Sequence, residues 1–436
     1  MNKYLLTMFL AASAASSSFA QANISPAAAQ TKPIYVLGAK LHIGNGKVID
    51  NGYLMIEKGK ITGVGDATLV KLNFSNGEVI QANDKHVYPG FIAPITNLGL
   101  AEFEAVKATL DFSEIGTLNP HIRAIVAYNT DSKVPATLRS NGILMAQVTP
   151  QGGVVAGSSS VVQLDAWNWE DAAIKTDDAM HLTWPVTPKP RQGFGGRGPQ
   201  VSQELLKERT QKSLEELDQL FAEAKAYTET TPVVTNARLA AMRNLFNGRQ
   251  KLFITADGEK DIIAAVNFAK KYGITPVLVG AEEASLVVDF LKQNNIAVVV
   301  RQPHALPNSI DDDVNKPYKN AAILANAGII VVVSIDGYWQ QRNLPFMAGT
   351  VAAWGLNPEQ ALQTITLNTA KVLGIEQRAG SLEQGKDATF FISSGDALDM
   401  KSNHVERAFI QGRDINLDNL HKQLDKKFSA KYSTAE

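Results

Sequence analysis

Short apolar runs alternate with segments of helical periodicity through most of the chain, and this alternation decides the predicted fold. Eight runs are rich in β-branched residues and end at turn residues, as buried strands do. They lie at 87–95, 142–148, 159–164, 181–184, 251–256, 275–280, 296–300 and 329–336. Helical spacing of apolar residues occurs at 204–227, 260–272, 282–294, 317–327 and 358–373. The pattern predicts an α/β protein with a TIM-type (β/α)8 barrel.

The N-terminal part of the chain has a different pattern. Residues 33–66 alternate apolar and polar positions around two turn signals, Asn45-Gly46 and Asn51-Gly52. Alternation of this kind on both sides of an Asn-Gly pair is typical of antiparallel hairpins. We therefore expect a small β-structure before the barrel.

The first barrel strand carries the most informative motif, VYPGFIAPITNLGL at residues 87–100. It resembles the first strand of the amidohydrolase superfamily, which typically reads PGFIDAHTHLG. The residues that agree are Pro89, Gly90, Phe91, Ile92, Thr96, Leu98 and Gly99. Ala93 replaces the family's aspartate, and Ile95 and Asn97 stand at its two histidines. The resemblance is to the secreted imidazolonepropionase-like branch of the family.

This resemblance implies a domain organisation. The barrel would cover 87–374, and a composite β-sandwich would combine 33–86 with 375–420. Segments 379–390 and 405–413 look like the strands that close this sandwich in relatives. The final residues, 421–436, are predicted to be a tail.

The resemblance also implies a metal centre, and the positions of its ligands can be compared one by one. Active relatives bind zinc or another divalent metal through histidines on the first, fifth and sixth strands, a Lys or Glu on the fourth and an Asp on the eighth. Here Ile95 and Asn97 replace the first pair, Thr255 replaces the next histidine, and the sixth strand ends at Gly280. Only Asp336 matches a ligand. Because zinc takes three or four protein ligands, we expect no metal ligands and no bound cofactor.

Six residues remain candidates for a rebuilt site at the barrel mouth. Asp336 could act as a general base, or could accept hydrogen bonds in a structural role. His304, after the seventh strand, is a weaker catalytic candidate, because a lone loop histidine is more often a surface residue. The substrate-binding candidates are Asn97, Thr255, Gln163 and Arg301.

Composition and charge exclude some classes of function. The chain has 436 residues, of which 45% are hydrophobic and 19% charged, and its net charge is −1. This balance suggests neither a nucleic-acid nor an anionic-membrane partner. Past the N-terminus, no stretch is long and apolar enough to span a bilayer.

Residues 1–20 have the features of a secretory signal: Lys3 near the start, an apolar core over 5–12 and small residues ending at Ala20. Residues 21–32, rich in Ala and Pro, are predicted to be a flexible leader. The chain contains no cysteine and so needs no disulfides. A periplasmic or secreted location is expected.

The segment 186–200 is dense in Gly, Pro and Arg. It is interpreted as a surface insertion, with a lid over the barrel mouth as the alternative.

Two functions follow from the resemblance. One is a hydrolase acting on C–N bonds, such as those of cyclic amides. The other is a non-catalytic protein that binds a small molecule or pairs with an active homologue. A small molecule is the expected partner in either case, and a homo-oligomer remains an alternative to the pair.

Overall fold

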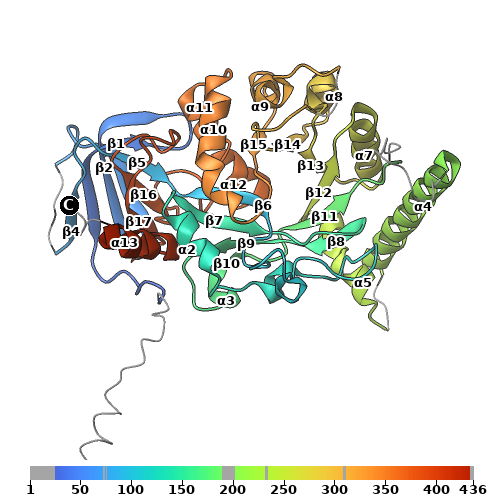
Figure 1. The fold of residues 1–436 in the computed structure, drawn as a ribbon, viewed down its shortest axis with the longest axis horizontal. Coiled ribbons are helices and arrows are strands. Elements are labelled where there is room, and N and C mark those ends of the chain that lie inside the picture. Colours follow the sequence, from blue (N-terminus) through green and yellow to red (C-terminus); the bar gives the residue numbers. More distant parts are fainter. Residues whose placement is uncertain are drawn as a thin grey trace, which may run out of the picture.

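The computed structural model describes residues 25–71, 74, 76–188, 202–230, 234–307 and 311–432. In this part of the chain the strands form three sheets, arranged in two regions that lie side by side in Figure 1. One region is an eight-stranded sheet, and the other holds the remaining two sheets and most of the helices. The protein is therefore a mixed α/β protein.

The eight-stranded sheet draws its strands from both ends of the chain. Its order is β18-β17-β16-β5-β1-β2-β3, and β4 pairs with β1. The strands are β1 (Ile34–His42), β2 (Val48–Glu57), β3 (Lys60–Asp66), β4 (Glu78–Gln81), β5 (His86–Pro89), β16 (Phe390–Ser393), β17 (Val405–Ile410) and β18 (Arg413–Ile415). Leu41 and Leu54 from the N-terminal strands share one apolar core with Phe390 and Phe409. The two ends of the chain thus stabilise each other.

The central body contains a six-stranded and a four-stranded sheet. The six-stranded order is β15-β14-β13-β12-β11-β8, and the four-stranded order is β10-β9-β7-β6. The strands are β6 (Phe91–Thr96), β7 (Ile143–Val148), β8 (Val155–Ser158), β9 (Ser160–Gln163), β10 (Ala173–Lys175), β11 (Ala179–Thr183), β12 (Lys251–Ala256), β13 (Val277–Gly280), β14 (Ala297–Val300) and β15 (Val331–Val333). Strands β11 to β15 are all parallel to their neighbours.

The third predicted strand runs in the opposite direction to the one that the barrel prediction requires. β8 runs antiparallel to β11, and β9 runs antiparallel to β7. Residues 149–154 are the whole connection between β7 and β8. A parallel crossover needs a dozen or more residues, so this short connection returns the chain in the opposite direction.

One apolar cluster joins the two sheets of the central body. Each of the strands from β6 to β15, except β8, contributes to it, β10 through the partly buried Ile174. Its members include Ile92, Met145, Val161, Ala179, Phe253, Val277, Val299 and Val332. Between β15 and β6 the chain segment Thr364–Ile365 bridges the gap, because Ile92 N donates to Ile365 O (3.0 Å) and Val333 N donates to Thr364 O (3.2 Å).

This bridge explains a second difference from the sequence prediction. The predicted helix 358–373 is divided into α11 (Pro358–Gln363) and α12 (Leu367–Leu373). The hydroxyls of Thr364 and Thr366 donate to carbonyls of the preceding turn, at 2.6 and 2.7 Å. Such β-branched residues that bond back to the helix favour a break. The predicted C-terminus is confirmed, since Gly374 caps α12 with φ 67°.

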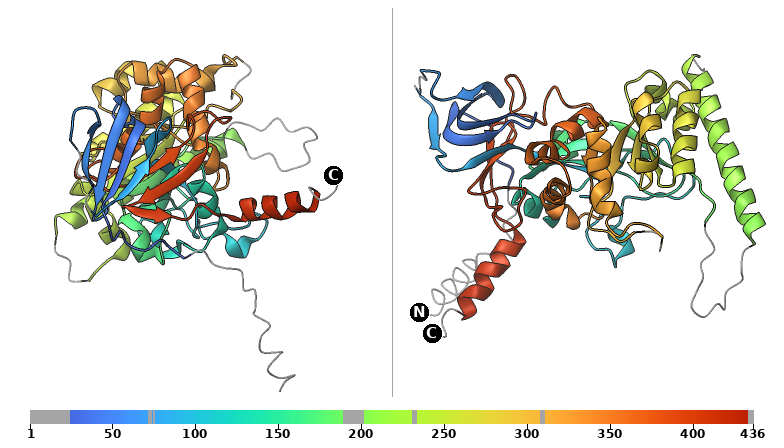
Figure 2. Two further views of the ribbon diagram at one scale, coloured as in Figure 1. Left: turned by 90° about the vertical axis from the view of Figure 1, so that its left-hand side faces the viewer. Right: turned by 90° about the horizontal axis from the view of Figure 1, so that it is seen from above.

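The remaining helices pack around the body or project from it. They are α2 (Lys133–Arg139), α3 (Trp169–Ala172), α4 (Gln203–Thr228), α5 (Ala237–Ala241), α6 (Arg243–Phe246), α7 (Glu259–Lys271), α8 (Val288–Gln293), α9 (Lys316–Asn326), α10 (Leu344–Ala353) and α13 (Leu420–Tyr432). Single 3-10 turns occur at η1 (Lys107–Thr109), η2 (Ala124–Ala127), η3 (Ala284–Leu286) and η4 (Gln340–Asn343). Figure 2 shows α4 and α13 at opposite ends of the molecule. No helix within the described ranges is both long and apolar enough to cross a membrane.

The predicted leader and insertion fall partly outside these ranges. Of 21–32, residues 25–32 are described and have specific partners: Ala27 N donates to Asp165 (2.9 Å), and Gly59 N donates to Gln30 (2.8 Å). Residues 189–200 of the predicted insertion, and all of the predicted signal segment, lie outside the described residues.

Candidate functional site

A pocket of about 190 Å³ opens where β13, β14 and β15 end. Parallel strands place the residues that follow them at one edge, which is where open and closed α/β folds form their sites. The polar residues that line the pocket are Glu282, Arg301, Gln302, Asp312, Lys316, Asn320 and Asp336. Two of the six sequence candidates, Asp336 and Arg301, are therefore brought together.

Arg301 lies between two carboxylates at this edge. Its Nη2 atom is 3.1 Å from Asp257 Oδ2, and its Nε atom is 3.8 Å from Glu282 Oε1. Burial raises the pKa of the Asp257 carboxyl, the Arg301 guanidinium opposes this rise, and the Asp336 carboxylate adds to it. Burial and the Asp257 charge also raise the pKa of Glu282. The arginine is thus held in a cluster that is acidic overall.

Two buried atoms of this cluster have unused hydrogen-bonding capacity. Arg301 Nε and Asp257 Oδ1 have no hydrogen-bond partner among the residues the structure describes. Both lie beside Gly280: a Cβ added there would stand 2.2 Å from Asp257 Oδ1 and 3.2 Å from Arg301 Nε. Gly280 also has φ +81°, which a side chain rarely adopts. A histidine at this position is therefore excluded while the Asp257–Arg301 pair is in place.

The first strand of the body is distorted at the positions of the missing histidines. From Ala93 to Thr96, β6 advances three residues while its partner β7 advances two, so β6 contains a bulge. Within this bulge Ile95 has φ 47°, an outlier for a β-branched residue. Asn97 is 8% exposed, and its Oδ1 finds no partner in the described part of the chain. The bulge breaks the regular alternation that would place side chains two apart on one side.

The other candidates are placed away from the pocket. His304 Nε2 is 2.8 Å from Thr350 Oγ1, and its ring lies 5.8 Å from that of Tyr318. Asn97 and Thr255 do not line the pocket. Neither residue shares a described contact with Asp336.

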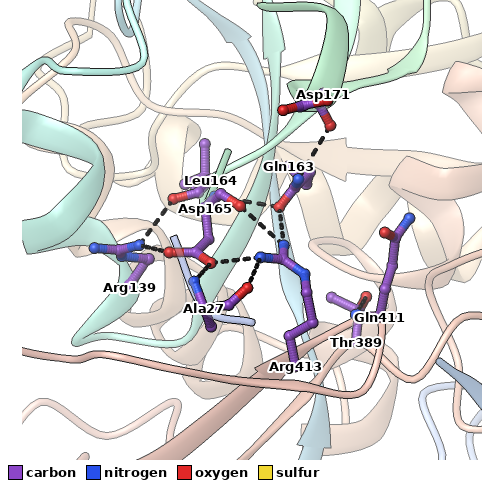
Figure 3. A network of polar contacts seen from close by, with 9 residues as sticks. All are labelled: Ala27, Arg139, Gln163, Leu164, Asp165, Asp171, Thr389, Gln411 and Arg413. Carbon is purple, nitrogen blue, oxygen red and sulfur yellow. Dashed lines mark hydrogen bonds and ion pairs between the residues drawn. The ribbon is translucent and has the colours of Figure 1, made fainter. Parts of the chain in front are cut away.

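Gln163 lies at the end of the strands opposite the pocket. The prediction that it lies at the barrel mouth is therefore wrong. Because β9 runs backwards, its last residue pairs with Met145 near the start of β7. Gln163 Oε1 accepts from Arg413 Nη2 (2.8 Å), and Arg413 Nη1 also binds Asp165 (2.7 Å). Figure 3 shows these residues with Arg139, on the other side of Asp165. This network joins β18 to the body.

A second polar cluster is buried between β7, β9 and β11, and the sequence reasoning did not find it. Ser159 Oγ is 2.8 Å from both Asp178 Oδ1 and His181 Nε2. Gln147 Nε2 donates to Asp178 Oδ2 (2.8 Å), and its Oε1 accepts from Ile95 N (3.2 Å). Burial raises the pKa of Asp178 to about 6 and lowers that of His181 to about 3. Asp178 and Ser159 have no exposed surface, so the cluster holds the body together.

The residues at the strand ends do not fit the metal centre of active relatives. Within the described ranges, no three His, Cys, Asp or Glu side chains are grouped so that they could hold a metal ion. At the pocket, the Arg301 guanidinium stands among the carboxylates, where a second cation would be repelled. The Asp257–Arg301 pair also fills the space beside Gly280. We derive no step through a metal from this site.

Comparisons of this chain with known proteins agree with one another. A family model described as "Amidohydrolase family" matches residues 198–415, half of the chain. Imidazolonepropionase of Flavobacterium psychrophilum is 26% identical over 215 residues, covering 43% of this chain and 51% of that protein. The chain thus spans about half the length of that relative. Imidazolonepropionase of Fusobacterium nucleatum is 24% identical over 402 residues, covering 84% of this chain and 91% of that protein.

Solved structures show the same fold. An amidohydrolase from Thermotoga maritima MSB8 superposes with a TM-score of 0.76 at 20% identity, covering 88% of this chain and 99% of that one. Molinate hydrolase superposes with a TM-score of 0.52 at 15% identity, covering 88% and 95%. At these identities the likeness concerns the fold alone.

Proposed function

This chain belongs to the amidohydrolase superfamily, in its imidazolonepropionase-like branch, and we propose that its strand-end pocket binds a small amide-bearing molecule without a resident metal. In this proposal the two sheets of the body form one barrel, closed through Thr364–Ile365, as the backbone hydrogen bonds on both sides of that segment support. The pocket then occupies one part of the barrel mouth.

One observation carries the choice of ligand: the Arg301 guanidinium lines the pocket together with the carboxylates of Glu282 and Asp336. An amide offers a carbonyl that accepts and, on its nitrogen, an N–H that donates, so one amide edge matches a guanidinium and a carboxylate. A hydrogen bond to a charged group contributes about 1.5–3 kcal/mol. The presence of two carboxylates favours a ligand with more than one N–H group. The small volume favours a ligand below drug size.

A slow hydrolase is the second candidate, and the exposed position of Asp336 at the pocket favours it. Asp336 would remove a proton from a water whose oxygen attacks the amide carbon, while the Arg301 guanidinium donates to the developing oxyanion. The C–N bond then breaks and the nitrogen takes the proton. A general base supplies about a hundred- to ten-thousand-fold, and water that is not metal-bound is a far weaker acid than metal-bound water. Turnover would therefore be slow.

A binding screen separates the two candidates. Cyclic amides, ureides and dipeptides are titrated calorimetrically into the purified chain, and product formation is followed on the same samples. We expect binding that Glu282→Gln and Arg301→Gln weaken about tenfold or more, since each removes one charged partner of the amide. Asp289→Asn on the exposed surface of α8 serves as the matched control. Hydrolysis that Asp336→Asn abolishes without unfolding the protein would instead establish the second candidate.

Metal content is measured on the same preparation. We expect less than one equivalent of zinc, iron or manganese after mild chelation, because the donor set does not fit. A retained equivalent, together with chelator-sensitive hydrolysis, would overturn the proposal.

Location and protein partners belong to the proposal as well. Removal of residues 1–20 would place the mature chain in the periplasm or outside the cell, and N-terminal sequencing of the secreted protein tests this. Association with a second copy or with an active homologue is tested by light scattering on the mature chain.

A further inference from the structure

We propose that α13, with the hollow beside its first turn, docks this protein onto an anionic phospholipid surface. The inference concerns a part of the molecule far from the strand-end pocket and does not depend on how that pocket is used. Figure 2 shows α13 projecting from the body.

The first observation is an apolar side on a helix that nothing in the described chain covers. Every residue from 420 to 432 is exposed. Large apolar side chains recur at every fourth position, and such spacing places them along one side of a helix. They are Leu420, Leu424, Phe428 and Tyr432, with 39%, 38%, 49% and 68% of their surface exposed.

The second observation is the positive charge on the rest of this helix. Lys422, Lys426, Lys427 and Lys431 share the helix with one carboxylate, Asp425. Lys427 Nζ lies 5.6 Å from the centre of the Phe428 ring, so an ammonium group stands directly beside an apolar side chain. A lysine-rich helix with leucine and phenylalanine on one side is the kind that lies in a membrane interface. The net charge of −1 conceals this basic segment because acidic residues elsewhere offset it.

The third observation is a hollow of about 640 Å³ at the base of the helix, lined by Leu420, Lys133, Arg139 and Trp167 among others. Trp167 is 65% exposed, and exposed tryptophans favour the headgroup level of a bilayer. Arg139 is buried and paired with Asp165, so its charge is already neutralised. The hollow, which Asp131 also lines, therefore contributes the Trp167 ring and the Lys133 ammonium beside the first turn of the helix.

Charge distinguishes the two partners that an exposed apolar helix could have, a second copy of this chain and a lipid surface. Pairing two copies through the apolar side would bring the lysines of both helices together, and like charges at an interface disfavour association. An anionic lipid surface attracts the same lysines, each strengthening binding about fivefold at low salt. The lysines therefore favour lipid over self-association.

The test uses the full mature chain and vesicles with or without phosphatidylglycerol, the remainder being phosphatidylcholine. We expect binding, measured by flotation, only to the anionic vesicles, and we expect added salt to weaken it. Lys426→Gln with Lys427→Gln should weaken binding about twentyfold or more, and Phe428→Ser about tenfold. Lys207→Gln and Leu205→Ser on α4, which has exposed residues of the same kinds, should leave binding unchanged. Circular dichroism confirms that each variant is folded.

Fluorescence gives an independent readout of the hollow. Trp167 should shift to shorter wavelength on anionic vesicles, and Trp167→Phe should lose the shift. Equal binding to both kinds of vesicle, or no binding to either, would overturn the proposal. A concentration-dependent dimer that Phe428→Ser dissociates, without vesicle binding, would assign the surface to a second copy instead.

Discussion

Strands β11 to β15 run parallel in unbroken register, whereas β6 to β10 contain a bulge, a strained isoleucine and a strand that runs backwards. Both halves are built from apolar runs of similar length. The regular half still delivers the ends of its strands to one edge, and the pocket with Arg301 and Asp336 lies there. In the irregular half, Ile95 lies inside the bulge of β6 and Asn97 directly follows that strand.

Under the proposed function, the regular half of the fold carries the binding role. The family model matches residues 198–415, which include β12 to β15 but not β6 to β10. Where the irregular half meets β11, polar side chains are turned inward as the Gln147–Ser159–Asp178–His181 cluster. We therefore expect mutations there to change stability, and mutations in the regular half to change ligand binding.

The largest effect is expected from Gln147→Leu. This change removes the Gln147 partner of Asp178 Oδ2 and of the Ile95 N–H, and both Gln147 and Asp178 are fully buried. We expect a loss of about 3 kcal/mol in the free energy of unfolding, measured in urea at neutral pH. Thr255→Val, on β12 of the regular half, should cost less than about 1 kcal/mol. Similar losses in both variants would remove the distinction between the halves.

The pH dependence of stability should show the buried cluster directly. Folding raises the pKa of Asp178 from 3.8 to about 6, so this group stabilises the folded state as pH falls from about 6 to about 4. Folding lowers the pKa of His181 from 6.5 to about 3, so this group destabilises the folded state over the same range. The two slopes oppose each other, each at most about 1.4 kcal/mol per pH unit.

The two slopes are separated by single variants. As the pH falls from 6 to 4, the stability of His181→Gln should rise relative to that of the wild type. The stability of Asp178→Asn should fall relative to that of the wild type. Comparing variants with the wild type removes the titration of all other groups. If neither variant differs from the wild type in its pH dependence, the cluster does not titrate as a buried unit.

A smaller effect is expected from Gly280→Ala in the regular half. The new Cβ would contact Asp257 Oδ1 at 2.2 Å and displace the carboxylate from Arg301. Gly273→Ala is the matched control, since Gly273 has φ +78° and nothing within 4 Å of the added atom. Both variants should lose about 1 kcal/mol of stability through the backbone. Only Gly280→Ala should also weaken amide binding, by about tenfold in calorimetry.

The smallest effect, no gain of metal, is expected when the missing histidines are restored. Ile95→His with Asn97→His returns the family's residues, but the bulge in β6 remains, and the described residues offer no further group of metal ligands. A zinc titration should show no tight site. Tight, stoichiometric zinc binding by this double variant would mean that the irregular half retains the metal geometry after all.

The sequence was sufficient for most strands and for part of the site. Runs of Val, Ile and Leu predicted β6, β7 and β11 to β15, because buried parallel strands are apolar on both sides. Strand direction depends on tertiary pairing, so the reversal of residues 155–163 and the place of Gln163 were not predictable from periodicity. Asp257 follows β12 directly and Glu282 is the second residue after β13, and a search for carboxylates at strand ends would have found both.

The bridge at Thr364–Ile365 has a consequence for how the chain can acquire its structure. β6 forms backbone hydrogen bonds on one side with a segment about 270 residues later. β5 pairs with β16, which begins at residue 390. Contacts this distant in sequence form slowly, because the intervening chain must lose much of its freedom first. A ribosome delivering this protein from its N-terminus would leave both regions with open strand edges until the last quarter of the chain emerged. During that interval the nascent chain depends on chaperones, since unpaired edges recruit other strands.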